Sequence, residues 1–215
     1  HNLCVCRQRG IHIVEPAQGR LACGDEGRGK LADVDDIVSY ASSVLFGIDG
    51  ASDETSKEED GHDLRGKKVL ITAGPTVEPI DAVRSITNRS SGKMGYAIAD
   101  CAKRRGADVV LVSGPVSIDA PAGVDLIKVE TAEEMLSSCE DPFTQSDIAV
   151  FCAAVADLRP LKSFDRKLKK GIDDEALSTI DLVPNPDIIA TLAAKKRDDQ
   201  VVVGFAAETD DVIEN

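Results

Sequence analysis

Short apolar runs alternate with longer amphipathic stretches along the chain from residue 64 onward. Runs of Val, Ile, Leu and Ala bounded by turn residues predict buried strands, and apolar residues at helical spacing predict helices. The strands are expected at 69–72, 109–113, 126–129, 148–154 and 201–205, and the helices at 93–105, 131–138 and 186–196. This alternation predicts an α/β domain with a Rossmann-like, mostly parallel sheet and helices on both faces.

The predicted helices carry their own start and stop signals. Gly106 ends the first helix, Thr131 is a suitable N-cap for the second, and Pro186 fits the start of the third. The apolar stripe of the first helix is expected to comprise Met94, Ala97, Ile98, Cys101 and Ala102.

Residues 1–46 have a shorter pattern of their own. A brief strand is expected at 11–14, a glycine-rich loop at 19–29 and a helix at 33–45, a unit too small to bury a core alone. The stretch that follows is strongly acidic and almost lacks large apolar residues, so it predicts a flexible linker. The expected parts of the chain are therefore a first unit at 1–46, a linker at 47–63 and a main domain at 64–215.

The composition narrows the possible partners. Hydrophobic residues make up 42% of the chain and aromatic residues only 3%, so the core must be aliphatic, which suits parallel strands buried on both faces. The formal net charge of -13 disfavours binding to nucleic acid or to an anionic membrane. No apolar run has the length of a membrane span, and the six cysteines lack zinc spacing. We therefore expect a reduced, cytoplasmic protein, with its metal ligands unassigned.

The segment 69–95 carries the clearest chemical signal. An apolar run ends in a Gly-Pro turn at Gly74, a polar loop follows, and the sequence SSGK at 90–93 opens a helix. Gly74 permits a sharp turn, the two serines can cap the helix, and the N–H groups of its first turn can bind an anion. A nucleotide or phosphate site is one interpretation, and an ordinary capped helix is the other. Neither the P-loop pattern nor GxGxxG is present.

Several motifs together resemble a known family. The runs AGPT and DAVRSITNRSSGKMGYAIA are followed in order by SGPVS, CAAVADLRP, KLKK, NPDII and VGFAAET. This ordered set is similar to the phosphopantothenate–cysteine ligase domain of coenzyme A biosynthesis. The earlier run ACGDEGRGKLA resembles the tail of the flavin-dependent phosphopantothenoylcysteine decarboxylase, which many bacteria fuse to the ligase in this order. The resemblance implies a small remnant of a flavodoxin-like decarboxylase domain before the linker and a Rossmann-like ligase domain after it.

The resemblance also implies an activity. In the bacterial members of the ligase family, CTP and a divalent metal such as Mg2+ convert the carboxylate of 4'-phosphopantothenate into an acyl-cytidylate with release of pyrophosphate, and the amine of cysteine then forms the amide. The family also includes ATP users, and the bacterial resemblance favours CTP. A carboxylate is a poor electrophile and CMP is a good leaving group, so the protein supplies positioning and charge neutralisation. The family further implies a homodimer through the ligase domain, larger assemblies through the decarboxylase, and FMN in the decarboxylase part.

The same resemblance implies the site residues. Asn88 is expected to face the reacting acyl phosphate, and Lys167 to reach the CTP phosphates from a charged loop, 163–174, that could be a mobile lid. Asp157 is expected to contact CTP, and Phe205 to pack on the cytosine or ribose. The other nucleotide-binding residues are expected to be Gly74, Ser90, Ser91, Gly92, Cys152, Ala153, Ala154, Asn185, Pro186, Asp187 and Ile188. Structural roles compete with these: an Asx turn for Asn88, a helix cap for Asp157 and core packing for Phe205.

Cys23 matches the cysteine that donates a proton in the decarboxylase family, and a thiol among flexible glycines suits that role. We expect no decarboxylase activity from this chain alone, because the family's catalytic His and flavin-binding segments would precede His1. Likewise, the ligase family continues beyond Asn215 with lysines that bind CTP. Two other functions stay open: a nucleotide-binding module without catalysis, and a Rossmann oxidoreductase, against which the missing GxGxxG counts.

Overall fold

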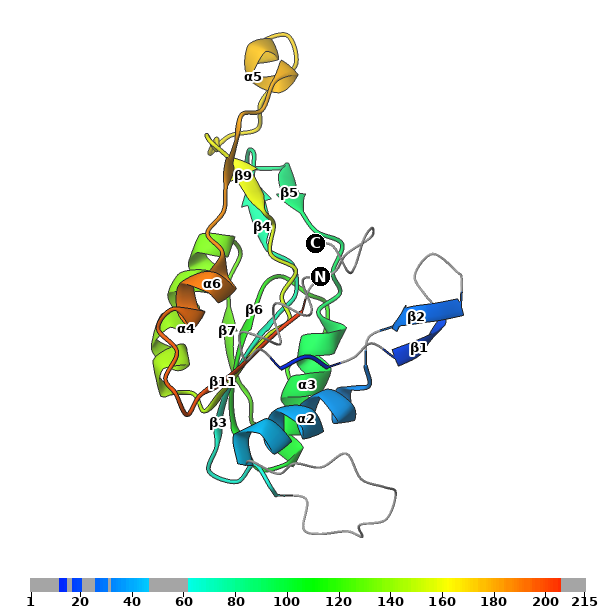
Figure 1. The fold of residues 1–215 in the computed structure, drawn as a ribbon. Coiled ribbons are helices and arrows are strands. Elements are labelled where there is room, and N and C mark those ends of the chain that lie inside the picture. The colour runs from blue at the N-terminus through cyan, green and yellow to red at the C-terminus, as the bar shows by residue number, and fades with distance from the viewer. Residues whose placement is uncertain (1–11, 15–16, 21–25, 31, 47–61, 206–215) are drawn as a thin grey trace. The chain divides into compact units, whose positions relative to one another are not determined.

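The structure is a computed structural model that describes residues 12–14, 17–20, 26–30, 32–46 and 62–205 (Figure 1). The chain divides into two compact units, one formed by 1–52 together with 205–215 and the other by 53–204. The second unit holds most of the predicted site residues.

A five-stranded parallel sheet forms the centre of the second unit. Its strands are β3 (Lys68–Ala73), β6 (Asp108–Ser113), β7 (Asp125–Lys128), β8 (Ile148–Phe151) and β11 (Val201–Gly204). They lie in the order β11-β8-β3-β6-β7, with the first strand of the unit in the middle. Counted along the chain this is the order 3-2-1-4-5 of a Rossmann sheet, in which ligands bind where the order reverses, here between β3 and β8.

Helices cover both faces of this sheet (Figure 1). Helix α3 (Lys93–Arg104) packs on one face, and α4 (Ala132–Gln145) and α6 (Ile188–Ala193) lie on the other. The main apolar cluster joins the second group of helices to the strands, and it contains Leu70, Val112, Met135, Cys139, Phe143, Ala149, Phe151, Ile188 and Leu192. Aliphatic strands buried on both faces explain why the sequence shows continuous apolar runs.

Helix α4 differs from its predicted length. Its N-terminus is as expected, because Thr131 accepts from the N–H of Glu134 and Glu134 reaches back to the main chain of Thr131 in a capping box. The predicted end at residue 138 is wrong, since the helix continues to Gln145 with Pro142 inside it. Cys139 and Phe143 continue the four-residue spacing of buried positions, and their packing outweighs the unfavourable proline.

Three other local predictions need correction. In α3, Met94 is only half-buried and Ala97 is exposed, because the helix approaches the sheet through Gly95, where a Cβ would lie 2.6 Å from that of Ala73. Helix α6 begins at Ile188 rather than at Pro186. Strand β8 ends before residue 152, and beyond it only an isolated bridge pairs residue 154 with residue 75.

The sequence patterns did not predict an arm that projects from the carboxyl end of the sheet (Figure 1). This arm consists of residues 77–87 and 158–184. It contains two antiparallel ribbons, β4 (Val77–Pro79) with β5 (Ser85–Thr87) and β9 (Leu158–Pro160) with β10 (Leu182–Pro184), and a short helix, α5 (Asp174–Ser178).

The first unit contains a hairpin and a helix in its described residues. Strands β1 (Ala17–Arg20) and β2 (Glu26–Lys30) pair antiparallel, so the loop predicted at 19–29 is wrong over the strand residues. Glycine-rich sequence is compatible with such a hairpin because the main-chain pairing does not need side chains. Residues 12–14 form no strand, whereas the predicted helix is confirmed as α2 (Val34–Phe46). Residues 47–61 of the predicted linker lie outside the described residues.

Candidate functional site

The loops that follow β3 and β8 meet at the carboxyl edge of the sheet, and Thr76 joins them. The Thr76 side chain is fully buried, and its Oγ1 accepts a hydrogen bond of 2.9 Å from the N–H of Ala156. Its main-chain N–H donates to the carbonyl of Ala154 at 3.3 Å, and the N–H of Ala154 donates to the carbonyl of Gly74 at 2.8 Å. The AGPT and CAAVADLRP motifs therefore lie side by side.

Two glycines let three loops approach each other at this edge. Gly74 and Gly92 have φ values of 73° and 72°, in the left-handed region that favours glycine. A Cβ on Gly74 would lie 2.9 Å from Cγ1 of Val116, and one on Gly92 would lie 2.7 Å from the same atom. The sharp turn predicted at Gly74 is present, and both glycines are buried where the three loops pack together.

The predicted serine caps of α3 are wrong. Gly92 occupies the N-cap position in the left-handed conformation, and no side chain caps the helix. Ser90 instead accepts from the N–H of Gly92 itself at 3.3 Å, and Ser91 is exposed. The first-turn N–H groups of this 12-residue helix are therefore not taken by a side-chain cap.

Asn88 links the loop after β5 to the loop after β8. Its Nδ2 donates to the carbonyl of Val155 at 2.9 Å and makes a longer contact of 3.4 Å with the carbonyl of Ala154. These partners are distant in sequence, so the side chain does not form the Asx turn that was the alternative interpretation. Thr87 Oγ1 donates to the carbonyl of Thr76 at 2.8 Å and holds the same loop in place.

The Asp157 side chain is exposed beside this joint. Strand β9 follows it directly, so the alternative role of a helix cap is wrong. Asn185 lies next to it, since its main-chain N–H donates to the carbonyl of Asp157 at 2.8 Å and its Nδ2 donates to the carbonyl of Ala156 at 2.7 Å. Arg159 donates to Oδ1 of Asn185 at 3.2 Å. The Asn185 side chain therefore holds the segment after β8 against the segment after β10.

The NPDII motif continues into α6. Asp187 is the N-cap, and its carboxylate accepts from the N–H of Ala190 at 2.8 Å. Pro186 precedes the cap and Ile188 is buried in the apolar cluster. In this structure the side chains of this motif thus have structural partners, and a nucleotide would meet mainly its main chain.

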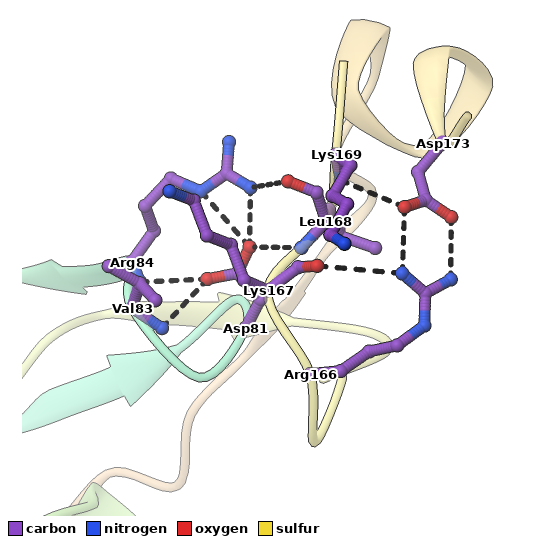
Figure 2. A network of polar contacts seen from close by, with 8 residues as sticks. All are labelled: Asp81, Val83, Arg84, Arg166, Lys167, Leu168, Lys169 and Asp173. Carbon is purple, nitrogen blue, oxygen red and sulfur yellow. Dashed lines mark hydrogen bonds and ion pairs between the residues drawn. The ribbon is translucent and has the colours of Figure 1, made fainter. Parts of the chain in front are cut away.

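Lys167 lies on the arm, and its loop is tied to the turn between β4 and β5 (Figure 2). The carboxylate of Asp81 accepts from the N–H of Leu168 at 3.0 Å and pairs with the Arg84 side chain. The Arg84 hydrogen bond holds the pKa of the Asp81 carboxyl well below its usual range. Within the loop, Arg166 pairs with Asp173 and likewise lowers the pKa of that carboxyl. The loop expected to be a lid is therefore attached at defined points.

Cys152 is a packing residue rather than a nucleophile. Burial raises the pKa of its thiol to about 12, as it does for Cys139 in the core. Thiols of this kind carry almost no thiolate at neutral pH and are chemically inert. Cys23 lies outside the described residues, and Phe205 directly follows β11.

Two surface hollows lie near these residues. One, of about 530 Å³, is lined by α4 and the end of β10, where Arg159 pairs with Glu133 at 2.8 Å. Its lining includes Asn185 and Pro186, two of the predicted nucleotide-binding residues, and Glu140 in the same lining pairs with Lys195 at 3.0 Å. The other, of about 570 Å³, lies at the ends of β6 and β7, between Tyr96 and Lys128. In the described part of the chain, neither hollow is lined by Asn88 or Lys167.

The described residues contain no group of three His, Cys, Asp or Glu side chains that could hold a metal ion. Mg2+ in nucleotide sites is commonly held by one or two carboxylates together with the substrate phosphates, so such a group is not required. Across the same residues, no helix combines the length and the apolar character that crossing a membrane requires.

A parallel sheet with glycine turns at its switch point defines an α/β protein with a candidate site where such folds bind nucleotides. Residues 64–215 match the family described as the C-terminal domain of the DNA/pantothenate metabolism flavoprotein, and the chain belongs to this family. The family resemblance predicted from the sequence motifs is thereby confirmed.

Relatives in bacteria are similar over almost the whole chain. The coenzyme A biosynthesis bifunctional protein CoaBC of Escherichia coli (strain K12) is 45% identical over 214 residues, which are 100% of this chain and 50% of that protein. CoaBC of Vibrio vulnificus (strain YJ016) is 44% identical over 211 residues, which are 98% of this chain and 49% of that protein. The chain thus spans about half the length of these relatives.

A solved structure supports the fold. The crystal structure of the C-terminal domain of CoaBC is 44% identical, with a TM-score of 0.59 over 69% of this chain and 68% of that one. The α/β architecture with a parallel sheet flanked by helices is therefore shared with that domain.

Proposed function

We propose that this chain carries the ligase step of a coenzyme A biosynthesis protein: CTP-dependent formation of the amide between cysteine and 4'-phosphopantothenate. The observation that carries the proposal is the contact of Asn88 with Val155, which joins two family motifs at the switch point of the sheet. The similarity to the CoaBC proteins supports the same pathway.

The reaction proceeds in two displacements. A carboxylate oxygen of 4'-phosphopantothenate attacks the α-phosphorus of CTP and pyrophosphate leaves, which gives the acyl-cytidylate. The amine of cysteine then attacks the acyl carbon, CMP leaves with the electrons of the acyl–oxygen bond, and the ammonium loses a proton. Both steps build negative charge on oxygen, so a fixed neutral donor is useful.

Asn88 is the donor we assign to this charge. One of its amide N–H groups is committed to Val155 at 2.9 Å, which fixes the orientation of the amide. The contact of 3.4 Å with Ala154 is too long to be a strong hydrogen bond, so a substrate oxygen can replace it. The side chain thus combines a fixed hydrogen bond with an exchangeable one.

The phosphates of CTP are assigned to the glycine turns and to lysine. Gly74 and Gly92 are buried and shape the turns at this edge, and the start of α3, which no side chain caps, carries the partial positive charge that an anion prefers. Lys167 adds a full positive charge from the arm, where its ammonium makes no hydrogen bond or ion pair among the described residues. Ala153 and Ala154 are small enough to admit the nucleotide beside the end of β8.

The test uses the natural full-length protein with CTP, 4'-phosphopantothenate, cysteine and magnesium. We expect pyrophosphate release that depends on all three substrates, together with an amide product identified by mass spectrometry. Asn88→Asp should lower turnover about 100-fold, as loss of an oxyanion donor does elsewhere, while calorimetry still detects CTP binding. Absence of CTP-dependent pyrophosphate release in the unmodified protein would contradict the proposal, and tighter binding of NAD than of CTP would favour an oxidoreductase.

We further propose that the full-length protein binds FMN and decarboxylates the amide product, with Cys23 as the proton donor. This step rests on the similarity to the bifunctional relatives. Cys23→Ser should leave pyrophosphate release unchanged and abolish formation of the final decarboxylated thiol, because a proton donor to the aminoenethiol intermediate acts after carbon dioxide has left. Loss of both activities together would contradict this assignment.

A homodimer through the arm is the assembly that we propose for the ligase domain. The exposed large apolar side chains among the described residues all lie on the arm: Val83, Leu158, Leu161, Ile172, Ile180 and Leu182. The pairing of β9 with β10 puts Leu158 and Leu182 on one face of the ribbon, which a second copy would cover. Replacing both with serine should halve the mass measured by light scattering, and an unchanged mass would refute this surface.

A further inference from the structure

Asp81 is a buried carboxylate surrounded by donors. Its side chain has an exposure of 0%, and its Oδ1 accepts from the N–H groups of Val83 and Arg84 at 2.9 Å each. Its Oδ2 accepts from the N–H of Leu168 and from Nε of Arg84 at 3.0 Å each, and it also pairs with Nη2 of Arg84. Every one of these donors except that of Leu168 comes from the same turn.

Leu168 is thus held by its main chain as well as by its side chain. Its carbonyl accepts from Nη2 of Arg84 at 3.0 Å, so the Asp81–Arg84 pair binds both its N–H and its carbonyl (Figure 2). Leu168 as a whole residue is only 2% exposed. A second attachment lies nearby, where the N–H of Phe164 donates to the carbonyl of Ile80 at 3.1 Å.

These contacts fix the loop that carries the exposed lysines. Lys167 and Lys169 flank Leu168 and are exposed, while the residue between them is buried. On the other side of Lys167, Arg166 is paired with Asp173, which also accepts from the N–H of Lys169 at 2.8 Å. Fixing a backbone residue costs about 1–2 kcal/mol of conformational entropy. Contacts that already order this loop in the free protein reduce the conformational entropy that is lost when CTP binds.

We infer that Asp81 is a positioning residue, which holds the main chain at Leu168 so that Lys167 presents its ammonium to the phosphates of CTP. The inference rests on the proposed function for the assignment of CTP. Asp81 itself is buried and saturated with donors, so it acts through Leu168 and not by contact with the nucleotide. The alternative is that these contacts only stabilise the arm.

The test compares Asp81→Asn with the control Asp100→Asn in the natural full-length protein. Asparagine has the shape of aspartate, but one of its two terminal atoms is an amide nitrogen, which donates hydrogen bonds and cannot accept them. The variant therefore cannot accept all the hydrogen bonds that Leu168 and Arg84 donate to the carboxylate. Asp100 accepts from Arg104 in an exposed pair on α3, so the control removes the same charge from another ion pair. We expect Asp81→Asn to lower kcat/KM for CTP about tenfold, mainly through KM, and Asp100→Asn to leave it unchanged.

A double-mutant cycle with Lys167→Ala separates positioning from stabilisation. If Asp81 acts through Lys167, Asp81→Asn should have no further effect on kcat/KM once Lys167 is alanine. Trypsin cleavage after Lys167 and Lys169 should also be about tenfold faster in Asp81→Asn, because the loop opens more often.

Two failures are distinguishable. The inference would be overturned by additive effects of the two substitutions on kcat/KM, or by unchanged trypsin cleavage. In that case the ligase activity of the unmodified protein would still support the proposed function. Absence of CTP-dependent pyrophosphate release in the unmodified protein would overturn both.

Discussion

Replacing Gly92 with alanine tests the close approach of three loops at the carboxyl edge of the sheet. A Cβ at this position would lie 2.7 Å from Cγ1 of Val116 and 3.3 Å from both Cα and N of Gly74. The left-handed backbone costs about 1–2 kcal/mol for a residue with a Cβ, and forcing packed neighbours apart costs about 1–3 kcal/mol more. We therefore expect Gly92→Ala to lower the free energy of unfolding by about 2–5 kcal/mol.

Gly66→Ala is the matched control. Gly66 has a φ of 76°, but a Cβ there would meet nothing within 4 Å. This variant should therefore lose only the backbone contribution of about 1–2 kcal/mol. Adding Val116→Ala to Gly92→Ala removes the methyl group that collides, so it should recover part of the difference between the two glycine variants. The contact with Gly74 remains, and recovery should be incomplete.

Urea unfolding followed by far-ultraviolet circular dichroism measures these effects, since the chain has no Trp to report by fluorescence. In thermal unfolding, each kcal/mol should correspond to about 2–4 °C in Tm for a chain of this size. Equal destabilisation by Gly92→Ala and Gly66→Ala, within about 0.5 kcal/mol, would refute the packing of the three loops against each other.

Three further predictions concern buried groups. At pH 8, iodoacetamide should modify Cys139 and Cys152 about a thousandfold more slowly in the native than in the unfolded chain, because burial raises both thiol pKa values to about 12. Peptide mass spectrometry measures the two rates, and equal rates would contradict this prediction. The free energy of unfolding lost in Asp81→Asn should be constant above about pH 5 and should shrink below about pH 4. The reason is that the folded-state pKa of Asp81 is lowered, so the stability that the carboxylate contributes disappears as pH falls toward that lower value. Urea unfolding across this range measures the loss, and a loss that grows on acidification would refute the predicted sign. Leu192→Ala should cost about 2–5 kcal/mol in the same unfolding assay because that side chain is fully buried, whereas the exposed Leu161→Ala should cost less than about 0.5 kcal/mol.

Most strands of the sheet could be predicted because they are continuous apolar runs, whereas β7 (DLIK) has only two adjacent apolar residues. The arm could not be predicted, since its strands have three residues each and β9 pairs with a partner that lies beyond a charged loop and a short helix. A pattern of period two is not detectable over so few positions. Helix α4 extends seven residues beyond its predicted end at residue 138, because the buried Cys139 and Phe143 continue its apolar face past Pro142.

Some residues of the candidate site could likewise be predicted from the sequence, and others could not. Gly74 and Gly92 could be recognised from the sequence because a positive φ favours glycine, and the structure has both in that conformation. Thr76 and Asp81 were missed as structural residues, although each forms a hydrogen bond to a partner 80 or more positions away. A hydroxyl or carboxylate in a polar loop gives no sign in the sequence of whether it will be exposed or buried. Burial of a polar residue depends on the tertiary fold, which brings its donors together.

The location of these contacts predicts that stability and turnover respond to different substitutions. The glycine turns and Thr76 adjoin the strands of the sheet, so damage there disturbs main-chain packing of the domain itself. The Asp81 contacts join two segments of the arm, and the large apolar cluster lies elsewhere, between the sheet and α4 and α6. Release of the Lys167 loop therefore leaves that cluster intact while it removes a fixed cation from the proposed phosphate site. Gly92→Ala should consequently lower Tm more than Asp81→Asn, whereas Asp81→Asn should change the KM for CTP at temperatures where both variants remain folded.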